Sequence, residues 1–217
     1  MTGKLSQARA RAGRPTKEEA AETSTRIIDA AAQLFAAQGF AATSMEQVAS
    51  ACNAGKDTIY RRFPSKLALF GAVVEHVRGR ILKRLDREID AVEEAGDTMA
   101  RLKQVARWFL TVNLDNELLA FRRIALSEGA LFGQDKQEPP QDDPIMERLI
   151  AIVAEAQAAG TLREGDTRFL AWHLLHCIVY GPTNEAMLGS TAFATVQAQD
   201  EFFEQAWELF LQGAEAR

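Results

Sequence analysis

Residues 43–66 constrain the fold more than any other stretch, because their pattern fits two short helices joined by a tight turn. Thr43 and Glu46 have the spacing of a capping box, which predicts a helix that begins just after Thr43. Asn53 tolerates the left-handed backbone that a tight turn requires, and Ile59 follows where a second helix would bury an aliphatic side chain. This pattern predicts a helix-turn-helix, whose second helix can enter the major groove of DNA.

The second of these helices has a polar outward face. The outward positions are Lys56, Asp57, Thr58, Tyr60 and Arg61. Four of the five carry donors that suit phosphates or base edges. From periodicity alone, two packed helices with a solvated polar face remain an alternative.

The distribution of charge favours a nucleic-acid partner, although the net charge of the chain is −5. Residues 1–85 contain 14 Lys and Arg against 7 Asp and Glu, a net charge of +7. Residues 86–217 contain 11 against 23, a net charge of −12. A basic N-terminal part on an acidic body is typical of a DNA-binding head.

The helix-turn-helix stretch resembles the DNA-binding motif of TetR-family transcriptional regulators. The resemblance runs from about Thr25 to Leu69 and includes the string Thr-Ile-Tyr-x-x-Phe-x-Ser-Lys at residues 58–66, which is highly specific to that family. We expect Thr43, Tyr60 and Lys66 to contact phosphates of double-stranded DNA. The full set of expected DNA-binding residues is Thr43, Ser44, Lys56, Asp57, Thr58, Tyr60, Arg61 and Lys66.

Two positions depart from the family pattern at the start of the recognition helix. Gly55 stands where the family usually has Ser or Thr, and Asp57 stands where Gly is common. Gly is an acceptable N-cap residue. Asp57 suits a helix N-terminus but repels phosphate, so it is expected to affect operator choice, for instance by accepting from cytosine.

Composition and periodicity predict an all-α fold. The 217 residues include only six Pro, and no run of alternating β-branched residues indicates a sheet. No apolar stretch reaches the roughly 18 residues that a membrane span needs, so we expect a cytoplasmic protein without a membrane partner. Cys52 and Cys177 are expected to be two reduced thiols.

Apolar stripes, together with caps at Asp97, Asp143 and Asp166, predict about nine helices in three regions. A mobile basic arm is expected at 1–22, the helix-turn-helix domain at 23–68, and a ligand-binding and dimerisation domain at 69–217. In the arm, Ala12-Gly13-Arg14-Pro15 resembles an AT-hook core without its first Arg, but a tail with only non-specific attraction is the alternative. The expected helices besides the helix-turn-helix pair are 23–38, 66–93, 98–113, 116–131, 144–159, 167–187 and 197–213, with a polar loop at 133–143.

The last two long helices are predicted to form a dimer interface. The helix that follows Asp166 is apolar on most faces, and such a helix is usually buried on most faces. Regulators of the family dimerise through two helices from each chain, which implies a homodimer here; a monomer with a deep core is the alternative. The expected interface residues are Leu170, Leu174, Cys177, Ile178, Phe202, Phe203, Trp207 and Phe210.

The resemblance also implies an effector cavity in the body, lined by apolar residues with a few polar handles. His173 and His176 have a spacing that can hold a metal, but no further ligand cluster lies near them in the sequence, so no metal is expected. The candidate lining residues are Phe70, Val74, Trp108, Phe109, Val112, Phe121, Met146, Ile150, Trp172, His173, His176 and Tyr180.

We find no phosphate-binding loop, nucleophile motif or pair of positioned carboxylates, so neither an enzyme nor a cofactor is expected. The resemblance implies a homodimeric bacterial regulator, and we expect a repressor that a small apolar or aromatic effector releases from a palindromic operator. One alternative is a helical ligand-binding or enzymatic bundle with a vestigial head. Another is an architectural DNA binder without a ligand.

Overall fold

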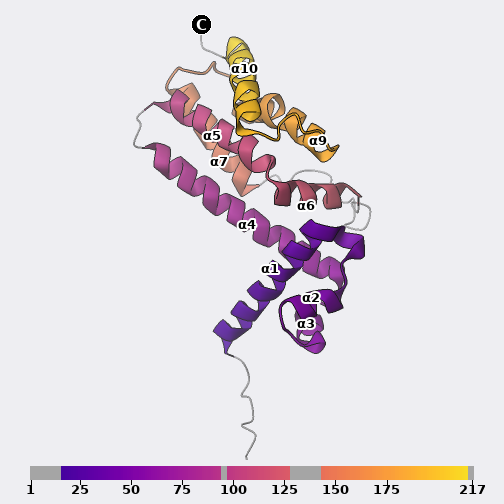
Figure 1. The fold of residues 1–217 in the computed structure, drawn as a ribbon. Helices are drawn as coiled ribbons and strands as arrows, with labels where there is room; N and C mark the ends of the chain where they lie inside the picture. Colours follow the sequence, from indigo (N-terminus) through magenta and orange to yellow (C-terminus); the bar gives the residue numbers. More distant parts are fainter. Residues whose placement is uncertain (1–15, 94–96, 128–142, 215–217) are drawn as a thin grey trace, which may run out of the picture.

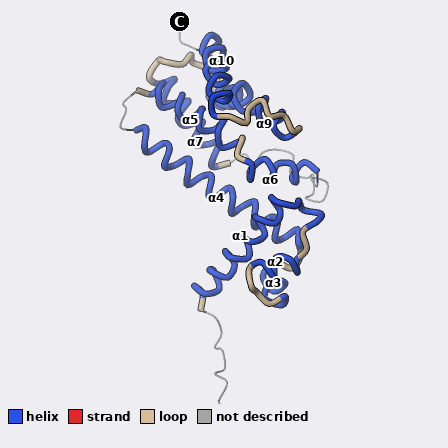
Figure 2. The backbone as a smooth tube through the Cα atoms, in the orientation of Figure 1, coloured by secondary structure: helices blue, strands red, loops and turns tan. Residues whose placement is uncertain are grey.

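The computed structural model describes residues 16–93, 97–127 and 143–214, and within these ranges it contains helices and no β-strand. A small head consists of α1 (Lys17–Ala42), α2 (Met45–Ala51) and α3 (Lys56–Arg62). From the head, the long α4 (Lys66–Glu93) runs into a larger helical body (Figures 1 and 2). The predicted all-α class, with a helix-turn-helix head on a helical body, is confirmed.

The head is held together by an aromatic cluster. Phe35 and Phe40 of the first helix stack with ring centroids 5.6 Å apart, and both meet the ring of Phe70 from α4 edge-on. Ile27 and Ile59 are fully buried in the same core. Fully buried aromatic and aliphatic side chains of this kind stabilise a fold by about 1.5–3 kcal/mol each, and through Ile59 this core includes α3.

The body comprises the remaining helices, several with the predicted caps. Asp97 caps α5, Asp143 caps α7 with Pro144 in its first turn, and Asp166 caps α8. A second hydrophobic core, which includes Leu102, Leu149 and Phe203, joins them. The helices are α5 (Thr98–Asn113), α6 (Asn116–Ser127), α7 (Pro144–Ala158), α8 (Thr167–Leu175), the π-helical turn η2 (His176–Tyr180), α9 (Gly181–Met187) and α10 (Val196–Ala214).

Two helices belong to both parts of the molecule. The N-terminal half of α4 contributes Leu69 and Val73 to the head core, and its C-terminal half contributes Leu85 and Ile89 to the body core. Phe121, from α6, is also buried in the head core. The head core therefore extends beyond the predicted domain boundary at residue 68.

The first helix differs from the prediction at both ends. It begins at Lys17, capped by Thr16, so residues 17–22 are helical rather than part of an arm. The backbone bends at Gly39, whose φ of 83° suits glycine, and continues through a short helical segment to Ala42. The AT-hook-like residues 12–15, the loop at 133–142 and the predicted helix end at 128–131 lie outside the described residues.

The cap of the second helix is also shifted by one residue. Ser44, not Thr43, is the N-cap of α2, and it forms the capping box with Gln47 rather than with Glu46. Two overlapping capping patterns are present in the sequence, and packing decides between them, because Thr43 is buried at the end of α1. The turn itself follows the prediction, with Asn53 at a φ of 50° and Gly55 as the N-cap of α3.

The predicted helix 167–187 is one continuous run with a wider turn in its middle. The π-helical turn His176–Tyr180 separates α8 from α9. Pro182 follows directly, in the first turn of α9. A proline has no N–H to donate and its ring crowds the carbonyl four residues back, which accounts for the widened turn.

Candidate functional site

The outward face of α3 is exposed and mainly basic. Lys56, Asp57, Tyr60 and Arg61 are all exposed, whereas Thr58 is half-buried against the turn. Ile59 anchors the opposite face of the helix in the core. The head therefore presents a short helix whose free side chains can approach a nucleic acid without disturbing the fold.

Lys56 has an acidic neighbour on this surface. Its Nζ lies 2.5 Å from Oε1 of Glu46 and 5.7 Å from the centroid of the Tyr60 ring. The hydrogen bond with Lys56 lowers the pKa of Glu46, and the same bond raises the pKa of Lys56. Both side chains are exposed, so Lys56 can readily exchange Glu46 for another anionic partner.

Lys66, which was predicted to contact phosphate, faces backbone carbonyls of the head in this structure. Its Nζ donates to the backbone carbonyls of Phe40 at 2.8 Å, Thr43 at 2.9 Å and Ala41 at 3.3 Å. It also lies 4.4 Å from the centroid of the Phe40 ring. A lysine has three N–H donors, and all three are used here, so Lys66 ties the C-terminal end of α1 to the start of α4.

Thr43 and Ser44 also have structural partners. The buried Thr43 hydroxyl donates to the Gly39 carbonyl at 2.8 Å and accepts from Gln38 at 3.2 Å. Ser44 Oγ accepts from the backbone N–H of Gln47 at 3.1 Å. The Thr43 hydroxyl is therefore buried and already has a donor and an acceptor as partners within the head.

Arg62 has a structural role that the sequence did not indicate. Its guanidinium donates to the Ala20 carbonyl and to Ser24 Oγ on α1. These partners lie 42 and 38 residues away in the chain, so no local pattern could reveal them. Arg61 faces solvent while Arg62 fixes the end of α3 to the first helix.

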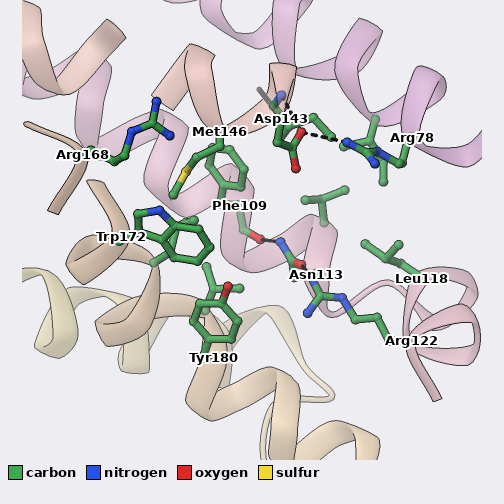
Figure 3. Close-up of a pocket in the computed structure, with 15 residues that line it drawn as sticks. Arg78, Phe109, Asn113, Leu118, Arg122, Asp143, Met146, Arg168, Trp172 and Tyr180 are labelled. Atoms are coloured by element: carbon green, nitrogen blue, oxygen red, sulfur yellow. Dashed lines mark hydrogen bonds and ion pairs between the residues drawn. The ribbon is translucent and has the colours of Figure 1, made fainter. Parts of the chain in front are cut away.

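The body contains a cavity of about 580 Å³ between α4, α5, α6, α7 and the α8–η2 segment (Figure 3). Its wall is mostly apolar, but several charged and polar side chains reach it. The lining residues are Arg78, Ile81, Phe109, Val112, Asn113, Leu118, Arg122, Asp143, Ile145, Met146, Arg168, Trp172, Leu175, Val179 and Tyr180.

Two of the guanidiniums in the wall are neutralised by carboxylates. Arg78 lies 3.1 Å from Oδ1 of Asp143, which also accepts from the backbone N–H of Ile145. Arg168 lies 2.6 Å from Oε1 of Glu147. These pairs tie α4 and α8 to the N-terminal part of α7.

Arg122 has a different environment. Its guanidinium donates to Oδ1 of Asn113, a buried residue whose Nδ2 donates to the Phe109 carbonyl at 2.7 Å. Burial lowers the pKa of Arg122, and burial raises the pKa of the nearby Tyr180 hydroxyl. The cavity thus combines an apolar wall with a cation, an amide and a hydroxyl.

Five of the twelve predicted lining residues border the cavity: Phe109, Val112, Met146, Trp172 and Tyr180. The other seven lie elsewhere. Phe70, Phe121 and Val74 pack in or against the head core, and Trp108 and Ile150 pack against the body core.

The two predicted histidines are exposed rather than lining the cavity. His173 stacks on Phe169, and His176 Nδ1 lies 2.8 Å from the Trp172 carbonyl. Among the residues that the structure describes, no group of three His, Cys, Asp or Glu side chains is arranged to hold a metal. Cys52 and Cys177 are both free thiols.

The prediction named mainly apolar and aromatic side chains, so it could not include the charged and polar residues of the wall. Which further apolar residues face the cavity depends on how each helix is rotated against its neighbours, and local sequence does not show this. The residues that sequence reasoning missed are Arg78, Ile81, Asn113, Leu118, Arg122, Asp143, Ile145, Arg168, Leu175 and Val179.

Most of the predicted interface residues face the core of their own chain. Leu170, Leu174, Ile178, Phe203, Trp207 and Phe210 are buried, and Cys177 and Phe202 are half-buried. The same helices expose other apolar side chains, with Phe169 59% exposed on α8 and Leu209 69% exposed on α10. Helical periodicity explains the difference, since an adjacent residue on a helix points about 100° away.

Across the described residues, no helix combines the length and apolar character that crossing a bilayer requires.

The two parts of the chain match two family models. Residues 27–73 match the family described as bacterial regulatory proteins, tetR family. Residues 100–213 match the C-terminal domain of AefR-like transcriptional repressors. The first match covers the head from residue 27 onward, and the second covers nearly all of the helices that follow α4.

Individual relatives agree with these matches. A tetR-family transcriptional regulator from Mesorhizobium loti MAFF303099 has a similar structure, with a TM-score of 0.76 and 27% identity over 93% of this chain and all of that one. The nucleoid occlusion factor SlmA of Photobacterium profundum is 27% identical over 84% of this chain and 91% of its own length. The transcriptional regulator AcrR of Shigella flexneri is 35% identical over 92 residues, only 42% of either chain.

Proposed function

This chain belongs to the TetR family of bacterial transcriptional regulators, and we propose that it acts as a homodimeric repressor that a small molecule releases from its operator. The observation that carries this proposal is the cavity in the body. Its wall is formed partly by α4 and α6, and both helices also contribute side chains to the head core. A ligand in that cavity would contact the elements that set the position of the head.

On DNA, the exposed face of α3 would occupy the major groove. Lys56, Tyr60 and Arg61 are the exposed side chains best placed for phosphates and base edges, with Asp57 and Thr58 beside them. Two such heads in a dimer would read half-sites of a palindrome about 34–36 Å apart. Lys66 and Thr43 would stabilise the junction between α1, α2 and α4 on which this surface rests.

Coupling would pass through three consecutive residues of α6. Phe121 is buried in the head core with its ring centroid 6.2 Å from that of Phe70. Arg122 lines the cavity, and Arg123 donates to the carbonyls of Met187 and Ala186 at the end of α9. A shift of α6 caused by a ligand would therefore move a side chain of the head core directly.

The α4 helix offers a second route. It enters the head core at Leu69 and Phe70, borders the cavity at Arg78 and Ile81, and is helical throughout. A tilt of such a rod changes the distance between the two heads of a dimer. A ligand can shift this equilibrium only by the difference between its affinities for the two arrangements.

The dimer would form through the outward faces of α8 and α10. Phe169, His173 and Leu209 are exposed there, and the ring of His173 also lies 6.4 Å from that of Phe210. A patch of exposed aromatic and aliphatic side chains on two long helices is suited to an isologous interface with a second copy.

Selection of binding sites from a random DNA pool tests the proposal. The expected product is a palindrome whose two half-sites are centred about one helical turn apart. Light scattering on the complex should give two chains or a multiple of two per site. Failure to enrich any sequence would refute DNA recognition, and a monomer bound to an unrepeated site would refute the dimer.

A further inference from the structure

The cavity contains one cationic side chain, that of Arg122, which no carboxylate of the described residues neutralises. Arg78 and Arg168 each pair with a carboxylate. Arg122 donates to the neutral amide of Asn113, and within the described residues no carboxylate forms an ion pair with it. This contrast distinguishes Arg122 from the other two guanidiniums of the wall.

The position of Arg122 makes its charge available to a ligand. It lies on the cavity wall with Leu118, one turn earlier on α6, and Tyr180 nearby (Figure 3). The fork of a guanidinium matches the two oxygens of a carboxylate. The Tyr180 hydroxyl, whose pKa burial raises, stays protonated at neutral pH and is a further donor.

The rest of the wall selects an apolar body for such a ligand. Phe109, Met146 and Trp172 present aromatic and thioether surfaces to the same space. The volume of about 580 Å³ is within the range of small-molecule sites. A partly buried cation without an anionic partner is unfavourable, so binding of an anion there brings a gain that a neutral molecule of equal shape lacks.

We propose that the effector is an amphipathic carboxylate, whose charged group binds Arg122 and whose apolar part lies against Phe109, Met146 and Trp172. This inference rests on the proposed function, because it names the chemical class of effector for the same cavity. It also assigns Arg122 as the residue that determines specificity.

Three unbranched probes with eight carbons each and different head groups test the proposal: octanoate, octanamide and octylammonium. Calorimetry on the full-length protein should show octanoate binding at least tenfold tighter than octanamide, with octylammonium weakest. Arg122→Gln should reduce octanoate affinity to that of octanamide. Arg122→Lys keeps the charge and should retain part of the preference.

Arg87→Gln is the matched control, because it removes the same charge from an exposed position of α4 and should leave the preference unchanged. Equal affinities for octanoate and octanamide in the unsubstituted protein would overturn the proposal, as would no binding of any probe. Circular dichroism of Arg122→Gln separates a lost contact from a lost fold, and Arg122→Lys supplies the answer if Arg122→Gln does not fold.

Operator binding, followed by fluorescence anisotropy in the same samples, separates this inference from the regulatory function. An Arg122-dependent preference for octanoate without any effect on operator binding would show that the cavity binds carboxylates but would overturn their role as effectors. Operator binding by the protein together with equal affinities for the three probes would leave the DNA-binding function intact and overturn the carboxylate assignment.

Discussion

The head and the body use partly buried cations in opposite ways. Lys66 in the head has three backbone carbonyls as partners, which occupy every donor it has. Arg122 in the body has the side-chain amide of Asn113. A saturated cation stabilises the fold and has nothing left for a ligand, whereas an unsaturated one costs stability and can bind an anion.

The exposed surface of α3 and the wall of the cavity also differ in how their charged side chains are held. The charged side chains of α3 are exposed and exchange partners easily, as the pair between Lys56 and Glu46 illustrates. Two of the three guanidiniums in the cavity wall, Arg78 and Arg168, are instead held by ion pairs with carboxylates in the N-terminal part of α7. We therefore expect substitutions in the head surface to change DNA affinity alone, and substitutions at the head–body junction to change stability and coupling together.

Phe121→Ala should have the largest effect, because Phe121 connects the two parts. Loss of a buried phenylalanine costs about 3–5 kcal/mol, so the free energy of unfolding measured in urea should fall by that amount. Phe121→Leu retains most of the volume and should fold, yet release operator less completely on ligand binding. Unchanged release in Phe121→Leu would exclude Phe121 from the coupling and leave α4 as the connection.

Lys66→Met should lower the free energy of unfolding by about 2 kcal/mol, because three carbonyls lose a charged donor. The decisive measurement is the dependence of operator affinity on salt concentration. Its slope should stay the same, since Lys66 does not neutralise a phosphate in this arrangement. A slope reduced by about 0.9 would instead place Lys66 on the DNA backbone and restore the contact that the family resemblance implied.

Leu209→Asp should weaken the dimer by about tenfold or more, because it places a charge in an apolar contact. Sedimentation or light scattering over a range of concentrations measures this change. Leu126→Asp, at a similarly exposed leucine on α6, is the control and should leave the dimer intact. Equal dimer stability in both variants would move the interface away from α10.

Lys56→Ala should have the smallest effect on the stability of the fold, and it should change DNA binding alone. Because its side chain is exposed, the unfolding midpoint should not change. The salt slope of operator binding should fall by about 0.9 if Lys56 contacts phosphate, or the preferred sequence should change if it contacts a base.

Glu46→Gln, which removes the ion-pair partner of Lys56, should strengthen operator binding at low salt and lose that advantage at high salt.

The chain's local patterns were sufficient for most of the helices. Asp97, Asp143 and Asp166 cap helices as predicted, and Asn53 has the left-handed turn conformation that the helix-turn-helix pattern required. Capping and turn preferences depend on neighbours within a few residues, so they can be read from sequence. The cap at Ser44 shows the limit of such local prediction. Two overlapping capping patterns are present there, and the burial of Thr43 determines which one forms.

The roles of individual side chains were decided by tertiary structure. Lys66 finds its nearest carbonyl 26 residues away, and the Arg78–Asp143 pair spans 65 residues. Which apolar residues of α8 and α10 face outward depends on how each helix rotates against its neighbours. The sequence by itself determined an all-α regulator with a helix-turn-helix head, because these features follow from local propensity and a family motif. Only the fold decided that Lys66 is a structural clamp and that Arg122 faces a cavity, because charge pairing and burial depend on residues far apart in the chain.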